Sequence, residues 1–211
     1  MSASTPVSRR RFLTGAPAAA GLAAVAMACR RGTKPSATAD LDLRDAVNAA
    51  GMEHVLVDTY KAATALALDG SLGAALPPVV FEFVALATGH HQQHLDAWNR
   101  YLTRAGRPAI TSPTAGLKRE VDTAVDRLTD VLAVAALALH LEDYASQSYL
   151  QALPGLTDAD AVRTAAQILV VDEEHQAFLR FLLGLSPVGT GTTKDVKDFA
   201  PADPGLGLLA G

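Results

Sequence analysis

Residues 168–182, with the sequence ILVVDEEHQAFLRFL, combine an apolar repeat with two side chains that can do chemistry. Asp172 and His175 fall at the same alternating steps of four and three as Ile168 and Leu179. This spacing places all four on one stripe of an α-helix. A carboxylate and an imidazole that face a core cost several kcal/mol unless they have a partner. A metal ion would be such a partner, so the pattern predicts further ligands elsewhere in the chain.

Three other apolar stripes carry side chains of the same kind. Glu53 lies on the stripe of a helix predicted over residues 41–69, and Glu142 on that of a helix predicted over 117–153. The motif H-x-x-H falls on the stripe of residues 78–104, and the helix that holds Asp172 is predicted over 158–183. The candidate metal ligands share a predicted inward position; they are Glu53, His91, His94, Glu142, Asp172 and His175.

The same arrangement occurs twice in the chain. Each of two helical hairpins has a glutamate on its first helix and two ligands at i and i+3 on its second. At 1.5 Å per residue, the depths of the two partners in each hairpin differ by only about 3–5 Å. The polar residues of each hairpin are therefore expected to meet at one level. Tyr60 and Tyr149 each follow a glutamate by seven residues, and are either core residues with a satisfied hydroxyl or donors to a ligand.

The composition favours helices in one domain. The 211 residues are rich in alanine and leucine, and only 5% are aromatic. This length is enough for one domain with a substantial core. The net charge of −4 becomes about −7 without the first 29 residues, which hold three arginines and no acid. No basic cluster is present in the rest of the chain, which argues against a nucleic-acid partner.

The first residues read as a targeting signal. Ser8, three arginines, Phe12 and Leu13 closely match the twin-arginine export pattern, and a Gly- and Ala-rich stretch follows to Ala28. That stretch is too short and too rich in glycine for a membrane span. We therefore expect residues 1–29 to be a removable signal. Resemblance to this signal class implies export of the folded protein, often with its cofactor in place.

Cys29, the only cysteine, stands where a lipoprotein signal places its lipidated residue. Lipidation would anchor the domain to the outer face of the membrane. The alternative is cleavage after Ala28, with Cys29 playing no part. Residues 30–40 are expected to form a flexible tether, and residues 185–211 an extended or disordered tail.

Across residues 41–184 the chain resembles the ferritin-like superfamily. The pattern of that superfamily is Glu, E-x-x-H, Glu and E-x-x-H on the successive helices of a bundle. The resemblance implies an all-α four-helix bundle with a long crossover between its second and third helices. By position, Glu53 and Glu142 match the single glutamates. The histidines match at His94 and His175, whereas His91 and Asp172 stand in place of glutamate.

These two replacements change the expected metal chemistry. Aspartate shortens one ligand by a methylene, but imidazole cannot bridge two metals in the way that a carboxylate does. The set becomes three carboxylates and three imidazoles, which suits softer, borderline ions better than the usual set does. The resemblance implies a pair of iron ions, with manganese or zinc as alternatives. A mononuclear site also stays open.

The sequence is therefore compatible with two functions. The first is an exported metal-binding protein with redox or oxidase chemistry. The second is a non-catalytic helical scaffold at the cell envelope, with a salt-bridged, metal-free polar core. A homodimer through an exposed helix face is compatible with either function. The remaining histidines are expected outside the ligand set, His54 and His90 beside the stripe and His140 on the surface; Glu173 and Glu174 are expected on a solvated face.

Overall fold

The computed structural model describes residues 37–73 and 75–185 of the chain. These ranges contain helices and no strand: α2 (Ala37–Leu68), α3 (Pro78–Arg104), α4 (Ala115–Val125), α5 (Val131–Ala152), the 3-10 turn η2 (Leu153–Gly155) and α6 (Ala159–Leu182). The described helices include none with the length and hydropathy of a membrane span. The predicted signal, Cys29 and all but the first residue of the predicted tail lie outside the described residues.

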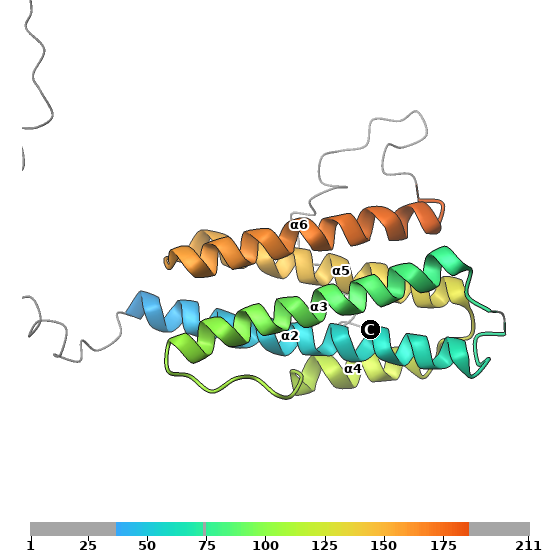
Figure 1. Cartoon of the computed structure of the whole chain (residues 1–211), viewed down its shortest axis with the longest axis horizontal. Coiled ribbons are helices and arrows are strands. Elements are labelled where there is room, and N and C mark those ends of the chain that lie inside the picture. Colours follow the sequence, from blue (N-terminus) through green and yellow to red (C-terminus); the bar gives the residue numbers. More distant parts are fainter. Residues whose placement is uncertain (1–36, 74, 186–211) are drawn as a thin grey trace, which may run out of the picture. The chain divides into compact units, whose positions relative to one another are not determined.

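Four of the helices form a bundle of two antiparallel hairpins. One hairpin pairs α2 with α3 and the other pairs α5 with α6, while α2 also packs on α5 and α3 on α6. Figure 1 shows that α3 and α5 run in the same direction, so the chain returns along the length of the bundle between them. The expected all-α four-helix bundle is confirmed, and it has the long crossover.

The prediction of one continuous helix over residues 117–153 is wrong. The segment is divided into α4 and α5 by a turn at residues 126–130. Asp130 ends the turn, because its side chain accepts a hydrogen bond from the backbone N–H of Ala133 and so caps α5. Leu132, which continued the apolar stripe of an unbroken helix, is 60% exposed. The crossover therefore spans residues 105–130 and includes α4, which supplies ample length for the return.

A glycine in the middle of α2 lets the crossover approach closely. The backbone N–H of Thr114 donates to the carbonyl of Gly51 over 3.1 Å. A Cβ on Gly51 would collide with the Thr114 hydroxyl. The crossover is thus docked two residues from Glu53, and α4 continues along the same face of α2.

The start of α2 is tied to the start of α6. Residues 37–40, placed in the tether by the sequence pattern, form the first turn of α2. Just beyond them the buried carboxylate of Asp42 accepts hydrogen bonds from the N–H and hydroxyl of Thr157 and from the N–H of Asp158, over 2.7–3.2 Å. This clamp sets the axial position of Glu53 on α2 relative to Asp172 on α6.

Removal of the clamp should destabilise the fold. In the variant Asp42→Ala, the donors of Thr157 and Asp158 lose their charged partner, which should lower the free energy of unfolding by about 1–3 kcal/mol. Urea denaturation followed by circular dichroism measures this change. Asp45→Ala on the same helix is the control, since its partner Arg44 is an exposed side chain at 3.6 Å. Equal losses in the two variants would contradict the clamp.

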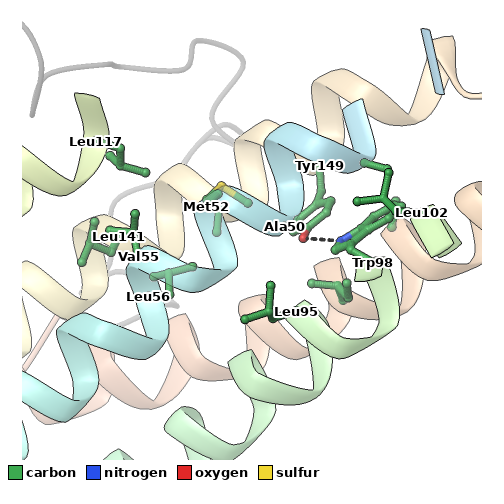
Figure 2. Close-up of a cluster of buried hydrophobic side chains, with 14 of the residues drawn as sticks. Ala50, Met52, Val55, Leu56, Leu95, Trp98, Leu102, Leu117, Leu141 and Tyr149 are labelled. Carbon is green, nitrogen blue, oxygen red and sulfur yellow. Dashed lines mark hydrogen bonds between the residues drawn. The ribbon is translucent and has the colours of Figure 1, made fainter. Parts of the chain in front are cut away.

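Two of the three apolar clusters among the described residues make up most of the bundle core. One contains Trp98, Tyr149, Leu56 and Leu141 and is drawn in Figure 2; the other gathers around Phe83. On α3 and α6 the predicted ligands fall in sequence between the members of the two clusters. The polar residues therefore lie within the bundle, with apolar packing on both sides along its axis.

Candidate metal centre

The six predicted ligands come together in the interior of the bundle. They reach it from four helices: Glu53 from α2, the two histidines of H-x-x-H from α3, Glu142 from α5, and Asp172 with its neighbour His175 from α6. Glu53, Glu142 and Asp172 have no exposed surface. His91 is likewise fully buried, and the other two histidines are at most 8% exposed. The ligands of the two hairpins, which the sequence pattern places at matching depths, therefore form one cluster.

His91 lies at the centre of this cluster, between two glutamates. Its Nδ1 is 2.9 Å from Oε2 of Glu53, and its Nε2 is 3.0 Å from Oε1 of Glu142. The ring therefore connects the first hairpin to the second through hydrogen bonds at both of its nitrogens.

The charges of Glu53, His91 and Glu142 stabilise one another. Burial raises the pKa of Glu53 and of Glu142, but the neighbouring imidazoles outweigh burial and lower each pKa to about 2. Burial lowers the pKa of His91, and the two carboxylates raise it by more, so that it lies well above its ordinary value. Without a metal, His91 is therefore an imidazolium that donates to a carboxylate on each side.

The other half of the cluster lacks such partners. Nδ1 of His94 is 3.5 Å from Glu53 and 3.7 Å from Oδ1 of Asp172, and Nδ1 of His175 is 3.3 Å from Oε1 of Glu142. None of these contacts has hydrogen-bond geometry. Five buried atoms of the cluster have no hydrogen-bond partner: Nδ1 of His94, Oε2 of Glu142, both carboxylate oxygens of Asp172, and Nδ1 of His175.

Asp172 is the least satisfied of the six residues. Burial and the negative charges of Glu53 and Glu142 raise the pKa of its carboxyl well above the ordinary value. Buried polar groups in proteins are nearly always hydrogen-bonded, and those that are not call for an explanation such as an ion. A cation among these atoms would satisfy them together.

Both predicted tyrosines donate hydrogen bonds to the glutamates. The Tyr60 hydroxyl donates to Oε1 of Glu142 over 2.5 Å, and the Tyr149 hydroxyl to Oε1 of Glu53 over 2.6 Å. Tyr149 in turn accepts from Nε1 of Trp98 over 2.9 Å, the bond drawn in Figure 2. Burial, followed by the adjacent glutamate, raises the pKa of each tyrosine well above 10. The hydroxyls therefore stay protonated and orient the two carboxylates.

Of the remaining histidines, His90 reaches the cluster. Its Nδ1 lies 3.0 Å from Nε2 of His175, and the two rings are stacked. With its hydrogen on Nε2, His175 presents the Nδ1 lone pair toward Glu142, which is the orientation a metal ligand needs. His54 pairs instead with Asp58 at 3.6 Å, and His140 is half-buried outside the six.

A polar pair lies next to the site, and of its two members the sequence reasoning placed Ser146 on the inward stripe but missed Gln176. The side-chain amide of Gln176 donates to the hydroxyl of Ser146 over 2.7 Å, and both residues are buried. Each lies four residues after a predicted ligand on the same helix, Glu142 or Asp172, so the helical period places both inward. Of the two glutamates on α6 that were predicted on a solvated face, Glu174 is exposed and Glu173 is half-buried.

The donors divide into two groups, each with the chemistry of a metal site. Glu53, His91 and His94 form one, and His91, Glu142, Asp172 and His175 form the other; within each group, one ligand atom per residue lies within 4.8 Å of the rest. Imidazole nitrogens and carboxylate oxygens are ligands for iron, manganese and zinc. The donor types and the unpaired buried atoms fit a metal centre.

Comparison with known proteins agrees with this architecture. A family model described as a ferritin-like domain matches residues 42–185, and the chain belongs to that family. A crystal structure of a conserved hypothetical protein from Mycobacterium tuberculosis has a similar fold: the TM-score is 0.56 at 20% identity, and the match covers 74% of this chain and 100% of the other. No curated protein matches the sequence. The chain is thus a ferritin-like protein with a buried His/Glu/Asp cluster that is compatible with metal binding.

Proposed function

We propose that this ferritin-like protein binds a pair of metal ions, with iron preferred over manganese or zinc, and serves redox chemistry at the cell envelope. The observation that supports the proposal most is the set of five unpaired buried atoms among six ligand-type side chains. A bound pair of iron ions would supply redox chemistry toward oxygen or peroxide.

The protein's own residues hold and orient the site. Glu53 and His94 would bind one ion, and Glu142 with His175 the other, while Asp172 borders both. The Tyr60 and Tyr149 hydroxyls hold one oxygen of each glutamate in place, and such supporting contacts commonly raise metal affinity. The apolar clusters on either side exclude bulk water.

A cavity provides room for a small molecule near the site. It has a volume of about 490 Å³ and is lined by residues of α2, α3, α4, α5 and α6, among them Tyr149 and Trp98. Through Tyr149 it is one hydrogen bond away from Glu53. The proposed substrate is therefore either a small organic molecule bound in this cavity or a metal ion that is itself oxidised.

Elemental analysis tests metal binding directly. The purified protein, supplied in turn with Fe²⁺, Mn²⁺ and Zn²⁺ and then desalted, should retain about two ions per chain. The double variant His94→Ala/His175→Ala should retain fewer than half as many, because each group loses one ligand. Wild-type protein that emerges metal-free from all three would overturn the proposal.

A metal-free scaffold is the second candidate, and the centre of the cluster favours it. The imidazolium of His91 between Glu53 and Glu142 neutralises one of their two negative charges without an ion. The bare carboxylate of Asp172 counts against it, because leaving a buried polar group unpaired has a cost that selection for stability alone would remove. Unchanged thermal unfolding on addition and removal of metal would favour this candidate.

We also propose export by the twin-arginine route with a lipid anchor at Cys29, on the strength of the S-R-R-R-F-L motif and the position of the cysteine. In a bacterial host with that route, replacement of Arg9 and Arg10 by lysine should retain the protein in the cytoplasm. The variant Cys29→Ser should move it from the membrane fraction to the soluble fraction. A Cys29→Ser variant that sediments with membranes as wild type does would exclude the anchor.

A further inference from the structure

We propose that His91 bridges two metal ions, one bound at each of its ring nitrogens, in place of the carboxylate bridge of a glutamate. This inference rests on the proposed metal binding and specifies how the two halves of the site are joined.

The first argument is the position of the ring. Among the residues that the structure describes, His91 is the member common to both ligand groups. Its Nδ1 faces Glu53 and its Nε2 faces Glu142, at 2.9 and 3.0 Å, so each nitrogen points toward a carboxylate of a different group. An ion that replaced the hydrogen in either of these bonds would be shared by the nitrogen and the facing carboxylate.

The second argument is the distribution of the remaining donors. His94 is perpendicular to His91 with its free Nδ1 near Glu53, and His175 has its free Nδ1 near Glu142. Each side of the His91 ring thus offers a glutamate and a second imidazole. The carboxylates of Glu53 and Glu142 are each held on one oxygen by a tyrosine, which fixes them on opposite sides of the ring.

The third argument is rigidity, because a bridging ring must be held in one orientation. His91 is fully buried, and Tyr60 stacks on it with ring centroids 5.5 Å apart and planes inclined by 21°. When two ions bind, both hydrogens carried by the imidazolium nitrogens pass to solvent, and the ring becomes a negatively charged bridge. That charge compensates for the glutamate that the position lacks.

Asp172 is the rival bridge. Its Oδ1 lies 3.7 Å from His94 while it belongs to the group of Glu142, so it also borders both halves. The two arrangements differ in the separation of the ions. Bonds of about 2.0–2.1 Å to both nitrogens of one ring place the ions roughly 6 Å apart, whereas two-metal sites of the ordinary kind have ions about 3.5–4 Å apart.

Crystals of the protein grown with Zn²⁺ decide between them through anomalous scattering at the zinc edge. The proposal expects two zinc ions per chain, roughly 6 Å apart, on either side of the His91 ring. Two ions about 3.5–4 Å apart, or a single ion, would overturn the bridge while leaving metal binding intact. A protein that takes up no Zn²⁺, Fe²⁺ or Mn²⁺ would instead defeat the proposed function.

Copper gives an independent readout in solution. Two Cu²⁺ ions joined by one imidazole ring couple magnetically, so the electron paramagnetic resonance intensity should fall below that expected from the copper content. His91→Gln should restore full intensity per bound ion, whereas Asp172→Asn, which removes the rival bridge, should keep the coupling in protein that has bound both ions. Coupling that survives in His91→Gln and disappears in Asp172→Asn would assign the bridge to Asp172 and overturn the proposal.

Discussion

Addition of a divalent metal ion should raise the midpoint of thermal unfolding of this protein by roughly 5–15 °C. An ion present at 100–1,000 times its dissociation constant stabilises the folded state by about 2.7–4.1 kcal/mol. In a domain of this size, each kcal/mol corresponds to roughly 2–4 °C. The binding energy has a clear source here, because the ion supplies partners to the five buried atoms that otherwise have none. Melts with Zn²⁺, Mn²⁺ or Fe²⁺ under argon, each compared with chelator, measure the shift.

Matched variants show whether the shift comes from the cluster. The double variant His94→Ala/His175→Ala removes one imidazole from each ligand group, so metal should leave its midpoint within about 2 °C of the value with chelator. His54→Ala/His140→Ala also removes two histidines, but neither belongs to the groups, and the full shift should persist. An equal shift in both double variants would place the bound metal outside the cluster.

The variant Asp172→Asn should have opposite effects on stability and on metal binding. Without metal, the Asp172 carboxyl is buried, unpaired and flanked by Glu53 and Glu142. Removal of its charge should raise the free energy of unfolding of the metal-free protein at pH 7 by about 1–3 kcal/mol. The same change removes an anionic ligand, so the stabilisation by metal should shrink. Urea denaturation with and without Zn²⁺ measures both effects.

The pH dependence of stability tests whether the buried charge of Asp172 causes this destabilisation. Because the folded protein raises the pKa of Asp172 above the unfolded value of about 3.8, stability is lost as the pH rises above 3.8 toward the folded pKa. With chelator, the advantage of Asp172→Asn should therefore be smallest near pH 4 and should grow toward pH 7. Destabilisation of the metal-free protein by Asp172→Asn at pH 7 would contradict this account.

Glu53 and Glu142 change the pH dependence of stability in the opposite sense to Asp172 and provide the internal control. Their folded pKa values of about 2 lie below the unfolded value of about 4.5, so their stabilising effect is present above pH 4.5 and is lost as the pH falls toward 2. Wild type and Asp172→Asn share this loss, because both retain the two glutamates. Acid unfolding at low pH should therefore be similar in the two proteins.

Helical periodicity was sufficient to identify most of the bundle. The predicted helix over residues 78–104 has the observed bounds of α3, and that over 158–183 differs from α6 by one residue at each end. The period of 3.6 also selected all six residues of the cluster, because a buried helix face shows the same spacing in the sequence whatever packs against it. The start of α2 and the break before α5 were less visible. Both α4 and α5 have an inward apolar face, so the repeat continues through the turn that separates them.

The sequence by itself determined the four-helix class, the two matched hairpins and the residues that face inward, since these depend on local spacing along each helix. Only the tertiary structure decided that His91 lies between Glu53 and Glu142, that Asp172 is left without a hydrogen-bond partner, and that His90 supports His175. A stripe gives the direction in which a side chain points, but the distance to a side chain on another helix depends on helix rotation, crossing angle and axial position. Those quantities are set by contacts between distant segments, such as the Asp42 clamp and the docking of Thr114 on Gly51.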